Sequence, residues 1–175
     1  MNFYQLCNAR QSCRKYDPNK IPEREKLDRI LDAARLSPSA CNGQPYHMTL
    51  CLEKTRAGVA KAVMGMGMNQ FCKDVPAFIV ISEKPYCATA ALGAKVKGND
   101  YRSIDIGILA SVISFAATEE GLGSCILGWL DDGKLRELLE LDGTARLVIA
   151  IGYPASEDMH RTKKRKSMSE LLTER

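Results

Sequence analysis

The chain carries its clearest helical pattern between residues 22 and 36. Apolar side chains recur there every three or four positions, the spacing that places them on one face of an α-helix. The residues on that face are Leu27, Ile30, Leu31 and Ala34. Pro22 suits a first turn, and Ser37 with Pro38 marks the end. We therefore expect an amphipathic helix that packs through one side.

Four further helices are predicted from caps and periodicity. Asn2 can cap a short helix that ends near Ala9, and helical patterns cover residues 55–64 and 131–141. A longer run, residues 104–116, is apolar nearly all round. A helix without a polar face is usually buried, so this one is expected at the centre of the fold.

Four segments have the pattern of β-strands: residues 46–52, 75–82, 124–129 and 146–153. The second and the last are almost unbroken apolar runs, which is typical of strands covered on both faces. Helices and strands do not alternate strictly, and no G-x-G-x-x-G or P-loop follows a strand, which argues against a Rossmann or nucleoside-triphosphatase fold. The sequence predicts an α+β fold whose central sheet is mixed, mainly antiparallel, and flanked by helices.

Two segments fit neither pattern. Residues 64–69 alternate methionine with glycine and end at Asn69. They are either a mobile wall of a pocket or a loop that caps the core with methionine side chains. Residues 92–99 are rich in glycine, alanine and lysine, and no element is assigned to them.

The size and composition predict a single cytoplasmic domain. The chain has 175 residues, of which 45% are hydrophobic and 26% charged, so we expect residues 1–175 to share one core. No basic segment followed by an apolar stretch opens the chain. The longest apolar run contains Asp105 and is shorter than the ~20 residues of a membrane span. No membrane partner is therefore expected.

The seven cysteines do not form a recognisable framework. Their number is odd, none forms a C-x-x-C pair, and the chain has only two histidines. This spacing supports neither a zinc site nor a disulfide network. We expect free thiols and no metal.

Much of the net charge of +4 lies in residues 160–166. Such a run can be a nucleic-acid arm, a solvated tail or a source of phosphate ligands. No aromatic residue interleaves with it, and no helix-turn-helix or OB pattern surrounds it. Nucleic acid is therefore not expected as a partner.

Two short motifs combine groups that suit a ligand. Residues 10–14 are Arg-Gln-Ser-Cys-Arg, and residues 38–45 are Pro-Ser-Ala-Cys-Asn-Gly-Gln-Pro. Two cations, hydroxyls and an amide-rich turn suit a phosphorylated, planar, hydrogen-bonding ligand better than a packing core. Taken alone, the first motif is more typical of an exposed helix end with solvated guanidiniums, and the second is also typical of a turn that ends a helix.

Five motifs, in order along nearly the whole chain, resemble the FMN-dependent nitroreductase family. They are R-x-S-x-R followed by Tyr16, P-S-A-C-N-G-Q-P-Y, the D-I-G at 105–107, G-L-G-S-C-I-L-G-W, and the I-G-Y-P at 151–154. The resemblance implies a homodimer with FMN at the interface and a domain-swapped C-terminal arm, about residues 155–175, that reaches the partner subunit. It also implies reduction of FMN by NADH or NADPH, then ping-pong, two-electron reduction of nitroaromatics, quinones or similar electron-poor acceptors.

The resemblance assigns phosphate and ribityl contacts to Arg10 and Ser12, with Gln11 between them in the same cofactor site. A guanidinium pairs with a phosphate dianion in a bidentate, charge-assisted geometry. Arg14 matches the cation that faces the pyrimidine edge of the flavin. A positive charge there stabilises the anionic reduced flavin.

The basic segment near the C-terminus acquires a role from the same resemblance. By their distance from the last predicted strand, Lys163 and Arg165 match the pair that completes the phosphate site. Lys164 or Lys166 could take either place.

The remaining matches surround the flavin ring. Pro38, Ser39 and Asn42 resemble the segment that reaches the flavin from the opposite subunit, and Asn69 matches a contact to the pyrimidine. The backbone N–H of Gly128, which follows Leu127 in the same site, matches the group placed against flavin N5, where glycine permits a close approach. No catalytic side chain is expected, because N5 accepts hydride directly.

Two other functions remain open. One is a thiol enzyme that uses Cys41 near His47, although no third group to orient them is apparent. The other is a flavin-binding or regulatory protein that holds FMN without turnover. Bleaching of a yellow protein by pyridine nucleotide, reversed by an acceptor, distinguishes an oxidoreductase from both.

Overall fold

Four strands form one sheet at the centre of the computed structural model, which describes all 175 residues. They are β1 (Tyr46–Cys51), β2 (Ala77–Glu83), β3 (Gly123–Leu127) and β4 (Ala145–Gly152), in the order β1-β2-β4-β3. Each neighbouring pair is antiparallel, with Val80 opposite both Thr49 and Val148. The sheet is therefore antiparallel rather than mixed, and parallel pairing is limited to an isolated bridge between Ser12 and Ser124.

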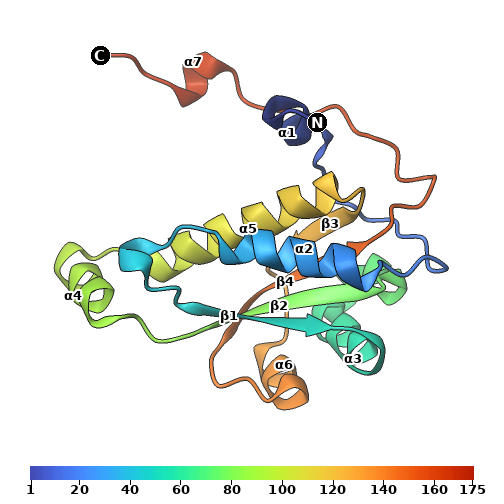
Figure 1. Cartoon of the computed structure of the whole chain (residues 1–175), viewed down its shortest axis with the longest axis horizontal. Helices are drawn as coiled ribbons and strands as arrows, with labels where there is room; N and C mark the ends of the chain where they lie inside the picture. The colour runs from blue at the N-terminus through green and yellow to red at the C-terminus, as the bar shows by residue number, and fades with distance from the viewer.

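Helices cover both faces of this sheet (Figure 1). The α-helices are α1 (Phe3–Ala9), α2 (Arg24–Arg35), α3 (Glu53–Val63), α4 (Ala88–Lys97), α5 (Tyr101–Glu119), α6 (Asp132–Leu139) and α7 (Met168–Leu171). Short 3-10 turns are η1 (Ala40–Asn42), η2 (Gly65–Gly67) and η3 (Gln70–Asp74). Helices α2 and α5 lie on one face of the sheet, and α3 and α6 lie on the other (Figure 1).

Alternation along the strands explains the two layers of core. In β2, Ile79 and Ile81 pack towards α2 and α5, whereas Phe78 and Val80 pack towards α3 and α6. Successive side chains of a strand point to opposite faces, so a strand covered on both sides must be apolar throughout. Burial on both faces therefore explains why β2 and β4 are almost unbroken apolar runs.

The predicted elements are present, with shifted ends, and two α-helices, α4 and the single turn α7, were not predicted. Helix α2 begins at Arg24 with Glu23 as its N-cap, so Pro22 precedes the helix instead of occupying its first turn. Helix α4 was not predicted, because only Ala90 is buried and no apolar stripe marks it. Its alanine content favours the helix instead.

The methionine segment is partly a core cap and partly surface. Met64 packs against the core, while Met66 and Met68 are exposed around the turn η2. The core-capping interpretation therefore describes Met64, and the pocket-wall interpretation stays a prediction.

The chain ends in a long arm. After β4 the chain passes close to α1 and continues to α7, away from the sheet and its covering helices (Figure 1). None of the helices is both long enough and apolar enough to cross a membrane.

Two arginines hold the end of β2 to the start of α5. Arg102 Nη1 donates to Glu83 Oε2 at 2.6 Å, and Arg146 Nη1 donates to the other carboxylate oxygen. Arg146 also donates to Ser103 Oγ. Although burial acts to raise it, these hydrogen bonds hold the pKa of Glu83 below its usual value.

Replacing Glu83 with glutamine should lower the free energy of unfolding by about 2 kcal/mol at neutral pH, because two partly buried guanidiniums lose their counter-charge. A carboxylate with a depressed folded-state pKa stabilises the fold above its unfolded pKa, and this is lost as pH falls through the folded value. Urea unfolding of Glu83→Gln beside the exposed control Glu137→Gln measures both effects. If the difference in free energy of unfolding between Glu83→Gln and the wild type does not shrink on acidification, the ion pair is not its source.

Candidate functional site

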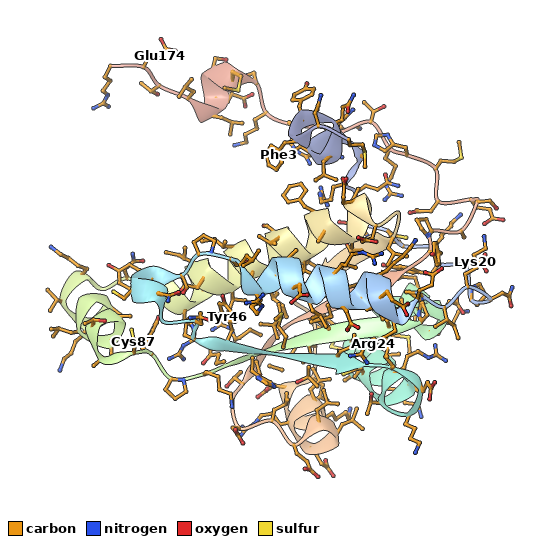
Figure 2. The ribbon with its side chains drawn as sticks, in the orientation of Figure 1. Phe3, Lys20, Arg24, Tyr46, Cys87 and Glu174 are labelled. Atoms are coloured by element: carbon orange, nitrogen blue, oxygen red, sulfur yellow. The ribbon has the colours of Figure 1, made fainter.

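The motif at residues 10–14 is held along the edge of the sheet. Helix α1 carries Phe3, labelled in Figure 2, and the Phe3 ring lies 5.8 Å from that of Phe115 on α5. Beyond the helix, Cys13 N donates to Ser124 O at 2.9 Å, and the Cys13 side chain is buried against Gly123. With Cys13 turned inwards, the flanking motif side chains remain accessible to solvent.

The C-terminal arm returns to this motif and forms one hollow with it, of about 310 Å³. Its lining comes from both ends of the chain: Arg10, Gln11, Ser12, Arg14, Arg161, Thr162, Lys163, Lys164 and Arg165. Lys163 Nζ donates to Arg10 O, and Arg161 donates to Ser12 O. Six of the nine residues are cations, and none is acidic.

This concentration of positive charge is only slightly compensated. Asp158, next to the hollow, pairs with Arg161 at 2.9 Å. Partial burial first, and then the charges of Arg10, Arg165 and Arg161, lower the pKa of Lys163. Cations that repel one another in this way are stabilised by a bound anion, so the hollow suits a phosphate group.

The second motif forms a tight turn at the start of α5. Ala40 N donates to Asp105 Oδ1 at 3.0 Å, and Ser39 Oγ accepts from Gln44 N at 3.0 Å. Asn42 lies exposed with φ at 53°, a left-handed conformation that asparagine tolerates better than most residues. Pro38, Ser39 and Asn42 thus lie together, on one surface turn.

A third group lies where β3 ends. Leu127 is buried in the core, whereas Gly128 is exposed and its N–H makes no hydrogen bond within the chain. Trp129 Nε1 donates to Gly65 O at 3.0 Å, which ties this end to the methionine turn that precedes Asn69. Asn69 itself donates to Val63 O, so part of its amide is committed to the fold.

The structure brings some of the predicted site residues together and separates others. Arg10, Ser12 and the tail cations share the hollow, but the turn at residues 38–42 lies near the other end of α5 (Figure 1). Ten residues separate Asp105, which holds the turn, from Phe115, which holds α1, or about 15 Å of helix. Within one chain, the motifs face different regions of surface.

Comparison with known proteins identifies the family. The nitroreductase family model matches residues 8–153. The chain belongs to the nitroreductase family. The chain is 30% identical over 166 residues to a protein of Methanothermobacter thermautotrophicus named for NADH dehydrogenase or NAD(P)H nitroreductase activity, covering 89% of this chain and 78% of that protein.

Solved structures of the nitroreductase family share the fold. A nitroreductase family protein of Streptococcus pneumoniae superimposes with a TM-score of 0.84 at 21% identity, over 99% of this chain and 100% of that one. An FMN-dependent nitroreductase of Clostridium difficile superimposes with a TM-score of 0.77 at 26% identity, over 99% of each chain. The resemblance to this family, drawn from the five motifs, is confirmed.

Sequence reasoning did not assign Arg161, Thr162 or Asp158 to the site. Arg161 and Thr162 line the hollow, and Asp158 lies beside it. The basic run at residues 160–166 was the available signal, but it does not reveal which of its members turn inwards. Lys164 lines the hollow, whereas Lys166 does not.

No hydrogen bond joins the residues of the alternative thiol site. Cys41 is exposed in η1, and His47 is exposed on β1, where it pairs with Ser82. The Cys41 thiol is free and makes no hydrogen bond, so no side chain orients it.

Proposed function

We propose that this nitroreductase family protein is an FMN-dependent NAD(P)H oxidoreductase that reduces nitroaromatics, quinones or similar electron-poor acceptors in two-electron, ping-pong steps. The observation that carries the proposal is the hollow with six cations and no acid among its lining residues. A doubly charged phosphate monoester, such as the phosphate of FMN, matches that charge and the mixture of guanidinium, ammonium and hydroxyl donors.

The residues of this chain bind and orient the cofactor in this proposal. When bound, FMN supplies the redox chemistry, taking two electrons from NAD(P)H and passing them to the acceptor. Arg10, Lys163 and Arg165 hold its phosphate. Arg14, whose charge also acts on Cys125, stabilises negative charge at the pyrimidine edge. The free N–H of Gly128 lies on a backbone that a flat ring can approach closely.

The proposal includes a homodimer whose subunits share each flavin site. The separation of the two motifs along α5 supports this, because one chain alone does not bring residues 38–42 to the hollow. The outer side of α5 carries an exposed, uncharged stripe that includes Ile104, Gly107 and Ser111. Beyond the residues that contact the N-terminal segment of the same chain, the end of the arm exposes Met168, Leu171 and Leu172, as expected of a swapped end that packs on a second copy.

An anaerobic absorbance experiment tests the activity. The protein, loaded with FMN, is titrated with NADH or NADPH and then with a quinone or nitroaromatic. Bleaching of the flavin bands at about 370 and about 450 nm, with recovery on adding the acceptor, is the expected result. A protein that binds FMN and is bleached by neither nucleotide would be a flavin-binding module without turnover. Failure to bind FMN would refute the proposal.

Replacing Gly128 with alanine is expected to slow flavin reduction without harming the fold. A Cβ built at Gly128 meets no atom within 4 Å, so the chain itself has room for the methyl group. A displacement of the ring by about 1 Å can cost roughly 100-fold in rate. Stopped-flow spectroscopy measures the rate of flavin reduction by NADPH, with Gly133→Ala on α6 as the control. An unchanged rate would place the ring elsewhere.

A further inference from the structure

The phosphate hollow exists only because the arm lies against the N-terminal segment. Pairing begins where Asp17 N donates to Tyr153 O and Ala155 N donates to Lys15 O. It continues with the contacts of Lys163 to Arg10 and of His160 to Asn8 O. These bonds join residues that are about 150 positions apart, so the arm is held in place by specific contacts and not by local chain stiffness.

Gln11 lies at the centre of this contact. Its Oε1 accepts from Arg161 N at 3.0 Å, and its Nε2 faces Met159 O at 3.4 Å and Asp158 Oδ2 at 3.5 Å. Both the oxygen and the nitrogen of the Gln11 amide therefore contact the arm. Because its amide is already hydrogen-bonded to the arm, Gln11 acts on the site through the arm.

Asp158 is the only carboxylate beside the cations. Its side chain is 2% exposed, and it accepts from Arg161 Nη1 at 2.9 Å. Arg161 in turn donates to Ser12 O, the backbone of the predicted phosphate segment. A buried carboxylate at this point offsets part of the repulsion among the cations and fixes the guanidinium that reaches Ser12.

We infer that Gln11 and Asp158 form a latch that holds the arm on the N-terminal segment of the same chain and so assembles the phosphate half of the site before the cofactor binds. The latch rests on the proposed FMN function, and Gln11 and Asp158 are positioning residues in it. A site built in advance does not lose binding energy to ordering the arm.

Asp158→Asn and Gln11→Ala test the latch, with Glu157→Gln as the control. Asp158→Asn removes the charge and keeps the shape, whereas Glu157 is exposed and makes no hydrogen bond or ion pair. The first readout uses the protein without flavin. Hydrogen–deuterium exchange at arm amides that donate hydrogen bonds, namely those of Ala155, Asp158 and Arg161, should accelerate about tenfold in both latch variants, the effect of losing roughly one hydrogen bond that holds the arm. The control should match the wild type.

The second readout compares FMN with riboflavin, which has no phosphate. FMN should bind about tenfold more weakly to both latch variants, while riboflavin binding stays unchanged. Equal weakening of both flavins, or FMN binding equal to that of the wild type, would overturn the positioning role. If Asp158→Asn lowers the melting temperature, Gln11→Ala decides, because Gln11 lies outside the two core clusters.

The failure of the latch can be told apart from failure of the proposed function. Wild-type protein that binds no FMN refutes the flavin function. The exchange experiment then still decides whether the latch orders the arm, since it needs no cofactor. Unchanged exchange in both variants, with normal FMN binding by the wild type, would refute the latch alone.

Discussion

Replacing Arg10 with alanine is expected to weaken FMN binding by about 10- to 100-fold, the range for losing charge-assisted hydrogen bonds to a phosphate. The arm should stay in place, because Lys163 is held by the backbone carbonyl of Arg10 and not by its side chain. Fluorescence titration of the protein with FMN measures the affinity. Loss of the guanidinium also reduces the positive charge of the hollow, so the salt dependence of binding should become shallower.

Two controls make the Arg10 experiment specific. Arg35→Ala removes an exposed arginine from the end of α2, paired only with Asp32, and should leave FMN binding unchanged. Riboflavin, without the phosphate, should bind Arg10→Ala and the wild type equally. Flavin retention in Arg10→Ala equal to that of the wild type would show that the phosphate assignment is wrong.

Placing a charge at Gly107 is expected to abolish both the dimer and FMN binding. Gly107 is exposed on α5, and a Cβ there meets no atom within 4 Å. Between residues 103 and 118 the only charged side chain is Asp105, which is buried, so the outer stripe is uncharged. Glutamate is also a better helix former than glycine, by roughly 0.5–1 kcal/mol, so the isolated subunit should remain folded.

The reason for the large effect at Gly107 is the cost of burying an unpaired charge in an apolar interface, several kcal/mol. Sedimentation of Gly107→Glu at micromolar concentration should give a monomer, with FMN affinity measured on the same sample. Gly133→Glu, at an exposed glycine of α6 on the opposite side of the sheet, is the matched control and should remain a dimer that binds FMN. A monomer that retains full FMN affinity would refute the shared site, and a persistent dimer would refute the α5 interface.

The experiments at Arg10, Gly107 and Gly128 examine separate parts of one proposal. Arg10 concerns the phosphate, Gly107 the sharing of the site between subunits, and Gly128 the approach of the ring to the backbone. Arg10→Ala and Gly128→Ala change different contacts, so their effects should be independent of each other, whereas Gly107→Glu removes the bound FMN on which both are measured.

Pattern along the chain was sufficient for most of the elements. Helix α2 and strands β2 and β4 were predictable because one-sided or two-sided burial imposes a period on apolar residues. Helix α4 was missed because only Ala90 is buried, so its sequence has no periodic pattern of apolar residues. The antiparallel order β1-β2-β4-β3 was not derivable in full, since pairing between distant strands is decided by tertiary packing and not by local preference.

For the site, the sequence by itself determined the family and the types of residue available: the cations of residues 10–14, the turn at 38–45 and the basic run near the C-terminus. The resemblance placed Arg10 and Lys163 in one phosphate site, and the tertiary structure shows both lining one hollow. Only the tertiary structure decided that Arg161 and Thr162 line it too, while the turn at residues 38–42 lies elsewhere on the same chain. It also revealed the contacts of Gln11 and Asp158, whose shared partner Arg161 is 150 residues from the first and three from the second. The charge and hydrogen-bonding capacity of a side chain follow from its residue type. The groups that it pairs with depend on how the two ends of the chain pack together.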